Sequence, residues 1–238
     1  MCANYTPTRA ERLEALLVTS VNEPFSFKYE CYPGNLAPLI RNAEGLPEDS
    51  GFERQLDYGM FGVVPPWADL KLARSTYNAR TETVATKPSF RSAWKRQQFC
   101  AIPVDNFFEP NYESGKPVRW QIEHVDGKPL CVAGLWEWRP NGGPDDRPLI
   151  SFTMLTINAD DHPLMRRFHK PGDEKRMIVL LDFDEVDAWL QSPLENAPEF
   201  FKQYDAEKLT AVAAPKAARA KKTPVQNAEE AFEDRFLF

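Results

Sequence analysis

An alternating segment followed by a two-residue turn most limits how this chain can fold. Residues 118–123 read VRWQIE, so apolar and polar side chains alternate as in a strand with one buried face. Asp126-Gly127 then precedes a second apolar run that begins at Leu130. An Asp-Gly pair between two such runs predicts an antiparallel hairpin.

Strand-like runs outnumber helical ones along the 238 residues. Strands are predicted at residues 25–32, 55–64, 99–104, 118–125, 130–138, 149–157 and 176–181. Helices are predicted at residues 6–19, 88–98, 184–191 and 198–204. Because strands and helices do not alternate regularly, we predict an α+β fold with a predominantly antiparallel, barrel-like sheet and inserted and flanking helices.

The composition divides the chain near residue 210. We expect residues 1–210 to form one domain, because a chain of this length buries roughly 70% of its unfolded surface. Residues 211–238 shift to Ala, Lys and Pro and then become acidic. We expect them to form a tail that is mobile or loosely docked.

Several classes of protein are excluded by composition and motif content. Hydrophobic residues make up 42% and charged residues 27%, which excludes a mainly disordered or fibrous chain. No membrane-spanning apolar run and no signal-peptide core occur, so we expect a cytoplasmic protein. Four widely spaced cysteines argue against a disulfide framework. Without a glycine-rich phosphate loop or paired metal-ligand spacing, we expect no cofactor and no metal.

The charge is distributed unevenly. A net charge of −6 argues against a protein that coats nucleic acid non-specifically. Basic residues nevertheless gather at residues 71–98 and 166–176, and aromatic residues are interleaved with them, namely Tyr77, Phe90, Trp94 and Phe168. Cations mixed with aromatic rings favour a phosphate-bearing partner. The alternative is that both clusters are ordinary solvated surfaces.

Cys2 would carry two nucleophiles on adjacent carbons after removal of Met1. Its α-amine, with a reference pKa of about 7.7–8.0, can attack an aldehyde to give an imine. The thiol can then close onto the imine to form a five-membered thiazolidine, or it can attack an acyl carbon as in an N-terminal hydrolase. The alternative is an incidental cysteine at the second position.

Two further residues are candidates for proton transfer. His169 lies inside the second basic cluster and is a better candidate base or shuttle than His124 or His162. Glu109 follows Asn106-Phe107-Phe108, an aromatic setting that suits a general acid. Taken singly, each could instead be an ordinary structural or loop residue.

A series of motifs occurs in a fixed order along the chain. They are MC at residues 1–2, NLAP at 35–38, GVVPPW at 62–67, NARTET at 78–83, FRSAW at 90–94, the segment 100–109, AGLW at 133–136 and the segment 156–181 around His169. Together they resemble the SOS response-associated peptidase family over about residues 1–190. NARTET after PPW, combined with Cys2, is the most specific part of the resemblance.

The resemblance implies a protein that binds single-stranded DNA and reacts with abasic sites. We expect it to be a monomer. In that family the N-terminal cysteine forms a thiazolidine link to the ring-opened sugar aldehyde, and residues before the cysteine are cut off. The implied catalytic set is Cys2 as nucleophile, Asn78 as orienting residue, Glu109 as acid/base and His169 as proton shuttle. Predicted DNA contacts are Arg80, Trp67, Arg91, Lys95, Lys170 and Arg176.

The chain departs from the family pattern close to these residues. Ala3-Asn4-Tyr5 stands where the family usually has Gly-Arg-Phe, Pro110 replaces a tryptophan, and a short insertion follows His169. Two other functions therefore stay open. One is an N-terminal cysteine peptidase acting on protein substrates, and the other is a non-catalytic single-stranded DNA-binding module.

Overall fold

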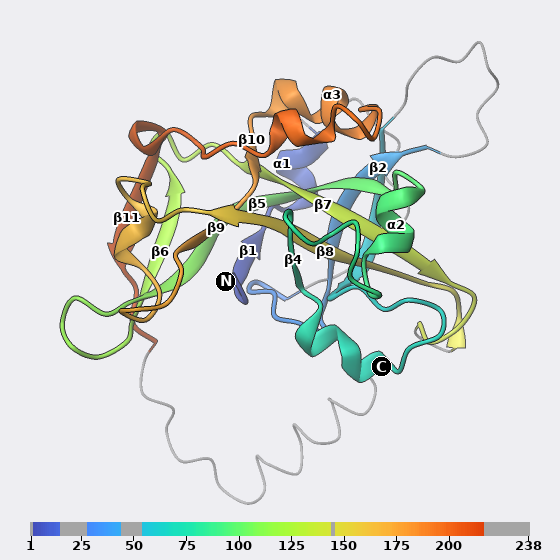
Figure 1. Ribbon diagram of the computed structural model, residues 1–238, viewed down its shortest axis with the longest axis horizontal. Helices are drawn as coiled ribbons and strands as arrows, with labels where there is room; N and C mark the ends of the chain where they lie inside the picture. Colours follow the sequence, from blue (N-terminus) through green and yellow to red (C-terminus); the bar gives the residue numbers. More distant parts are fainter. Residues whose placement is uncertain (1, 15–27, 44–53, 144–145, 217–238) are drawn as a thin grey trace, which may run out of the picture.

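The computed structural model describes residues 2–14, 28–43, 54–143 and 146–216 (Figure 1). In these ranges the backbone forms one sheet of 11 strands. They are β1 (Tyr5–Pro7), β2 (Leu36–Asn42), β3 (Arg54–Phe61), β4 (Asn78–Arg80), β5 (Phe99–Asn111), β6 (Val118–His124), β7 (Leu130–Arg139), β8 (Leu149–Asn158), β9 (Arg176–Ile178), β10 (Leu180–Leu181) and β11 (Leu209–Ala213). The α-helices are α1 (Ala10–Glu14), α2 (Arg91–Lys95) and α3 (Val186–Leu190). None of the described helices is long and apolar enough to cross a membrane.

Five of the strands close into a barrel. Strand β7 pairs with β8 on one side and with β5 on the other, and β3 and β2 complete the ring between β8 and β5. The pairing of β3 with β8 is parallel, whereas the other pairings in the ring are antiparallel. The predicted α+β fold with a predominantly antiparallel, barrel-like sheet is therefore confirmed. Strands β6 and β11 extend the sheet beyond β5 (Figure 1). The predicted hairpin across Asp126-Gly127 is wrong, because β6 and β7 each pair with β5 and not with each other.

Aromatic rings dominate the core beside the chain start. Phe61 and Phe152 stack with their centroids 5.5 Å apart, and Tyr5 meets Phe61 edge-on at 5.2 Å. On the side of β5 that α3 covers, the Trp189 indole Nε1 donates to the Cys100 carbonyl at 2.9 Å. A buried indole needs such a partner, so this hydrogen bond fixes the helix against the strand.

The beginning of the chain differs from the prediction of a helix over residues 6–19. Residues 5–7 form β1, and α1 begins only at Ala10. Pro7 has no N–H to contribute to a ladder, and it lies in a strand that pairs with β5 alone, where proline is tolerated. Residues 15–27, which hold the rest of this helix and the start of the predicted strand 25–32, lie outside the described residues. Within 28–32 the backbone makes only an isolated bridge from Cys31 to Tyr5.

The sequence pattern also misses three strands and misplaces several element ends. It does not predict β2, β4 or β11, and β5 continues to Asn111 rather than ending at Val104. The predicted strand 176–181 is divided into β9 and β10, and the predicted helix 198–204 is a short 3₁₀ helix, Ala197–Phe200. Strand β11 crosses the expected domain boundary at residue 210 because it pairs with β6. Residues 217–238 of the expected tail lie outside the described residues.

A glycine after β3 sets the path of the chain toward the start of β4. Gly62 has a φ of 112°, and a Cβ added there would lie 2.2 Å from the Ala73 carbonyl oxygen. Ala73 belongs to the 3₁₀ helix Leu70–Ser75, which precedes β4. Only glycine combines this backbone conformation with this close approach.

Replacing Gly62 with alanine should therefore lower the free energy of unfolding by about 3 kcal/mol, because backbone strain adds to steric overlap. Gly115 has a φ of 79° but open space around it. Gly115→Ala is thus a matched control that should cost only about 1 kcal/mol. Urea denaturation measures both losses, and equal losses would contradict the argument from close approach.

Candidate active site

The pairing of β1 with β5 carries the chain start toward Glu109. Tyr5 lies opposite Phe107, and the Phe108 N–H donates to the Asn4 carbonyl at 2.9 Å. Because antiparallel strands run in opposite directions, residues before Tyr5 continue alongside residues after Phe107. Cys2 and Glu109 consequently lie in one buried region, with exposed fractions of 1% and 3%.

Asn78 reaches Cys2 from a different part of the sheet. It is the first residue of β4, which pairs in parallel with β8. Its side-chain Nδ2 donates to the Cys2 carbonyl oxygen at 2.7 Å. Its Oδ1 is buried and has no hydrogen-bond partner among the described residues. Since buried polar atoms are normally paired, this oxygen is a candidate acceptor for a donor on a bound group.

His169 approaches Glu109 from the loop that precedes β9. Its backbone N–H donates to the Pro110 carbonyl at 2.8 Å, which attaches this loop to the end of β5. The φ of His169 is 64°, a left-handed conformation that is uncommon outside glycine. The ring Nε2 lies 2.9 Å from Oε2 of Glu109. The structure therefore brings the two predicted proton-transfer residues into direct contact.

The Cys2 thiol is held in its neutral form. Burial raises the pKa of this thiol far above its usual range, and the nearby Glu109 carboxylate raises it further. Sγ lies 3.5 Å from the Asn4 carbonyl, to which the thiol donates. The pKa of Tyr77 is raised as well, by burial and then by Glu109 and Cys2. A neutral thiol suits a reaction in which sulfur attacks after an electrophile has formed beside it.

An arginine that the sequence interpretation did not select lies beside the chain start. Arg119 of β6 donates to Oδ1 of Asn4 from Nε at 3.2 Å and from Nη2 at 2.9 Å. Nη2 also donates to Glu30 at 2.7 Å, and the guanidinium lies 3.3 Å from the centre of the Phe108 ring. The family resemblance expects arginine at position 4, and in this chain Asn4 is contacted by the Arg119 guanidinium instead. Its polar position in the alternating run 118–123 was the only available sequence signal.

The predicted DNA-contacting residues occupy two kinds of surroundings. Four of them are exposed or largely so, namely Trp67, Arg91, Lys95 and Lys170. Arg80 is also accessible, with 48% of its side chain exposed, although it pairs with Glu174 at 2.8 Å. Arg176 differs because only 3% of its side chain is exposed, and it pairs with both Glu82 and Glu174.

The two other histidines have structural surroundings. His162 is buried, and its Nδ1 accepts from the N–H groups of Leu164 and Met165 at 3.1 and 3.0 Å. Its Nε2 therefore carries the proton and donates to the Tyr204 carbonyl at 2.8 Å. His124 accepts the Asp126 N–H at 3.1 Å. These contacts fix turns and leave His169 as the histidine at the site.

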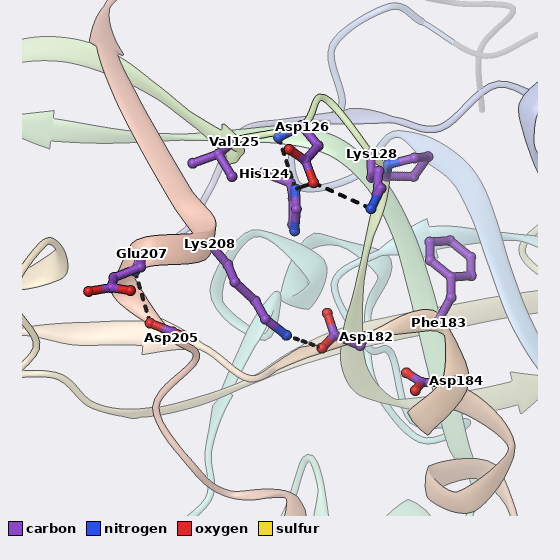
Figure 2. A pocket seen from close by; sticks show the side chains of 11 residues that line it. His124, Val125, Asp126, Lys128, Asp182, Phe183, Asp184, Asp205, Glu207 and Lys208 are labelled. Carbon is purple, nitrogen blue, oxygen red and sulfur yellow. Dashed lines mark hydrogen bonds and ion pairs between the residues drawn. The ribbon is translucent and has the colours of Figure 1, made fainter.

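Two surface cavities bear on the location of the site. One of about 600 Å³ has His169 in its wall, together with Arg166, Arg167 and Lys175. The other is lined by the turn after β6, by residues 182–184 and by the turn before β11, and by none of the predicted site residues (Figure 2). There Lys208 already contacts Asp182 and Lys128 contacts Asp126. In the part of the chain that the structure describes, no group of three or more His, Cys, Asp or Glu side chains is placed to hold a metal ion.

Cys2, the Asn78 amide and the Glu109–His169 pair thus meet at the chain start. The fold and this arrangement define a class of barrel-like α+β proteins in which the cysteine after the initiator methionine lies among an amide, a carboxylate and an imidazole. The family described as SOS response associated peptidase (SRAP) matches residues 1–219. The chain belongs to this family, as its motif order predicted.

Known proteins similar to this chain agree with that assignment. Abasic site processing protein YoaM of Bacillus subtilis is 30% identical over 184 residues, which cover 74% of this chain and 75% of YoaM. Abasic site processing protein HMCES of Xenopus tropicalis is 26% identical over 194 residues, or 71% of this chain and 55% of HMCES. A crystal structure of a Bordetella bronchiseptica protein matches with a TM-score of 0.78 at 34% identity, covering 90% of this chain and all (100%) of that one.

The raised pKa of Cys2 predicts how its replacement changes stability with pH. In the unfolded chain the thiol ionises near its reference pKa of about 8.5, whereas the buried thiol keeps its proton. Above that pH the unfolded state has therefore lost a proton that the folded state retains, and the free energy of unfolding falls by about 1.4 kcal/mol per pH unit. Cys2→Ala removes this loss. The free energy of unfolding of the variant relative to wild type should therefore rise by about 2 kcal/mol between about pH 9 and 10.5. Urea denaturation under reducing conditions measures it, and parallel pH curves would contradict it.

Proposed function

We propose that this protein processes abasic sites in single-stranded DNA and links itself covalently to them through Cys2. The observation that carries the proposal is the contact of the buried Glu109 with the partly buried His169, 2.9 Å apart, beside Cys2, which can supply an amine and a thiol together. Membership of the SRAP family and similarity to proteins named abasic site processing protein support the same function.

The chemistry begins with the α-amine that removal of Met1 would uncover. The amine attacks the aldehyde carbon of the ring-opened abasic sugar to give a carbinolamine, which loses water to form an imine. The Cys2 sulfur then adds to the imine carbon, and the thiol proton ends on the nitrogen. The product is a thiazolidine, and the net reaction releases one water. Each step moves a proton, and a positioned acid–base pair accelerates such steps by about 100-fold or more.

The site residues divide this work according to their positions. Asn78 fixes the Cys2 carbonyl, so the amine and the thiol of that residue keep one orientation toward the aldehyde. Glu109 takes the thiol proton and returns it to nitrogen, and its contact with His169 supplies or removes the second proton. The Asn78 Oδ1, which has no partner among the described residues, can accept a hydrogen bond from the carbinolamine.

The surroundings of the site suit a single strand better than a closed duplex. A sugar can reach a buried nucleophile only where the strand is free to bend and its bases are unstacked. Trp67, with 68% of its surface exposed, offers a stacking face, and Arg91 and Lys95 lie on the exposed side of α2. The protein would act as a monomer in the cytoplasm.

We propose in addition that the same residues remove any segment ahead of Cys2. The Cys2 sulfur would attack the preceding carbonyl carbon, the peptide nitrogen would leave as the free α-amine after protonation, and water would hydrolyse the resulting thioester. This reaction uses the same nucleophile and the same acid–base pair. It would also prepare the amine that the abasic-site reaction requires.

Covalent capture can be tested on a denaturing gel. Protein whose loss of Met1 is verified by intact mass should form a stable adduct with a single-stranded oligonucleotide that carries one abasic site. Cys2→Ser should lose the stable adduct but keep an adduct trapped by borohydride, because its amine still forms the imine. An identical oligonucleotide without the abasic site is the control. No adduct from processed wild type would contradict the proposal, and salt-sensitive binding indifferent to Cys2 would favour a non-catalytic module.

Self-processing can be tested with a short leader placed before Cys2. Intact mass should show that the wild-type protein loses the leader, and Glu109→Gln should slow the loss by about 100-fold because general acid–base catalysis is removed. Glu207→Gln removes the same charge in the cavity of Figure 2, so it is a matched control that should behave as wild type. Leader loss in Cys2→Ala would contradict autocatalysis.

A further inference from the structure

The loop that lengthens the chain after His169 brings a carboxylate onto the arginines beside the site. Glu174 contacts Nη1 of Arg80 at 2.8 Å, Nη1 of Arg176 at 2.5 Å and Nδ2 of Asn158 at 3.3 Å. Two guanidinium groups and an amide around one anion are the kind of donor set that proteins use for phosphate oxygens. In this chain the set is occupied by a side chain.

We propose that Glu174 is an internal competitor of the DNA phosphate and masks Arg80 until a strand displaces it. The inference rests on the proposed function, because it supposes that a strand passes the end of β4. Arg80 lies two residues after Asn78, which holds Cys2, so a phosphate next to the reacting sugar comes within reach of Arg80. The carboxylate of Glu174 occupies the guanidinium edge that this phosphate would use.

The two arginines that contact Glu174 differ in how they are held when Glu174 leaves. Arg176 is buried and stays anchored without Glu174, because Nη1 and Nη2 donate to Glu82 at 3.1 and 2.9 Å and Nη2 donates to the Thr156 carbonyl at 2.7 Å. Arg80, by contrast, has 48% of its side chain exposed, and Glu174 is its only ion-pair partner within the described ranges. Displacement of Glu174 therefore breaks its contacts with Arg80 and Arg176 and leaves the contacts of Arg176 with Glu82 and Thr156 intact.

The loop also holds Glu174 in place before any DNA arrives. The Lys175 Nζ donates to the carbonyls of His169 and Lys170 at 3.2 and 2.9 Å, and the Lys175 N–H donates to Asp160 at 2.8 Å. Because these contacts fix Lys175, the residue after Glu174, they hold the Glu174 carboxylate in contact with Arg80. Such a competitor weakens the reversible binding of undamaged strands, whereas a covalent adduct, once formed, persists.

The neighbouring residue provides a matched control. Asp173 is exposed, and its only hydrogen bond in the described structure runs from its backbone N–H to the Lys170 carbonyl at 3.1 Å. Asp173→Asn and Glu174→Gln each remove one negative charge from the same loop. The difference between them isolates the contact with Arg80 from the general effect of charge.

The test is the affinity for a fluorescent single strand without an abasic site, measured by anisotropy at low and moderate salt. Glu174→Gln should bind about two- to fivefold more tightly than Asp173→Asn, the range expected for one exposed ion pair, with a smaller gain at higher salt. The gain should vanish when Arg80→Gln is combined with Glu174→Gln. Equal affinities of the two single variants, or a gain that survives Arg80→Gln, would overturn the proposal.

A second measurement separates this proposal from the proposed function. Inorganic phosphate should raise the thermal midpoint of Glu174→Gln more than that of Asp173→Asn, because the freed donor set can take an anion. This readout needs neither DNA nor Cys2. If phosphate raises the thermal midpoint of both variants equally, the proposed role of Glu174 is wrong even if the covalent adduct forms. A larger rise in Glu174→Gln supports that role even if no adduct forms.

Discussion

The backbone pairing of β1 with β5 is the interaction on which the rest of the site depends. Three residues of strand are enough because Tyr5 is fully buried against Phe61 and the Asn4 carbonyl accepts the Phe108 N–H. Chain termini are usually poorly ordered unless something ties them down. Here the pairing of β1 with β5 fixes Cys2 beside the Glu109 carboxylate. Without this pairing, a cysteine so close to the start of the chain would have no defined position.

Strand β5 also positions the other two proton-transfer candidates, Glu109 and His169. It pairs with β1, β2, β6 and β7, so it belongs to the closed ring and also carries a residue of the candidate site. Glu109 lies near its end, and the next carbonyl, that of Pro110, accepts the His169 N–H. The carboxylate and the imidazole are therefore positioned by backbone hydrogen bonds of one strand. Rigid elements hold reacting groups more accurately than loops do, which suits a reaction that needs an aligned amine, thiol and acid.

Local sequence patterns predict part of this structure. The rest depends on contacts between residues far apart in the sequence, which such patterns do not reveal. The strands β6 and β7 are predictable because alternation is a local signal. The hairpin expected from the Asp126-Gly127 turn is wrong, because β6 and β7 pair with different parts of β5 and not with each other. Strand β4 is not predictable in this way, because three residues are too few to show an alternating pattern. Its position is set by its pairing with β8. The same holds for Arg119, whose contact with Asn4 joins residues far apart in the sequence. The motif order predicted that Cys2, Asn78, Glu109 and His169 belong together, and their catalytic roles stay predictions.

The electrostatics of the site favour one order of events. Burial and Glu109 keep the Cys2 thiol protonated, so sulfur is a weak nucleophile in the free protein. An α-amine, with a reference pKa of about 7.7–8.0, has a neutral fraction at physiological pH and can attack first. In the proposed reaction, imine formation would then place an electrophilic carbon next to the thiol, and the same Glu109 that opposes thiolate formation would be the base that accepts its proton. A thiol kept neutral in this way would be spared from oxidation and stray alkylation until an aldehyde reaches the amine.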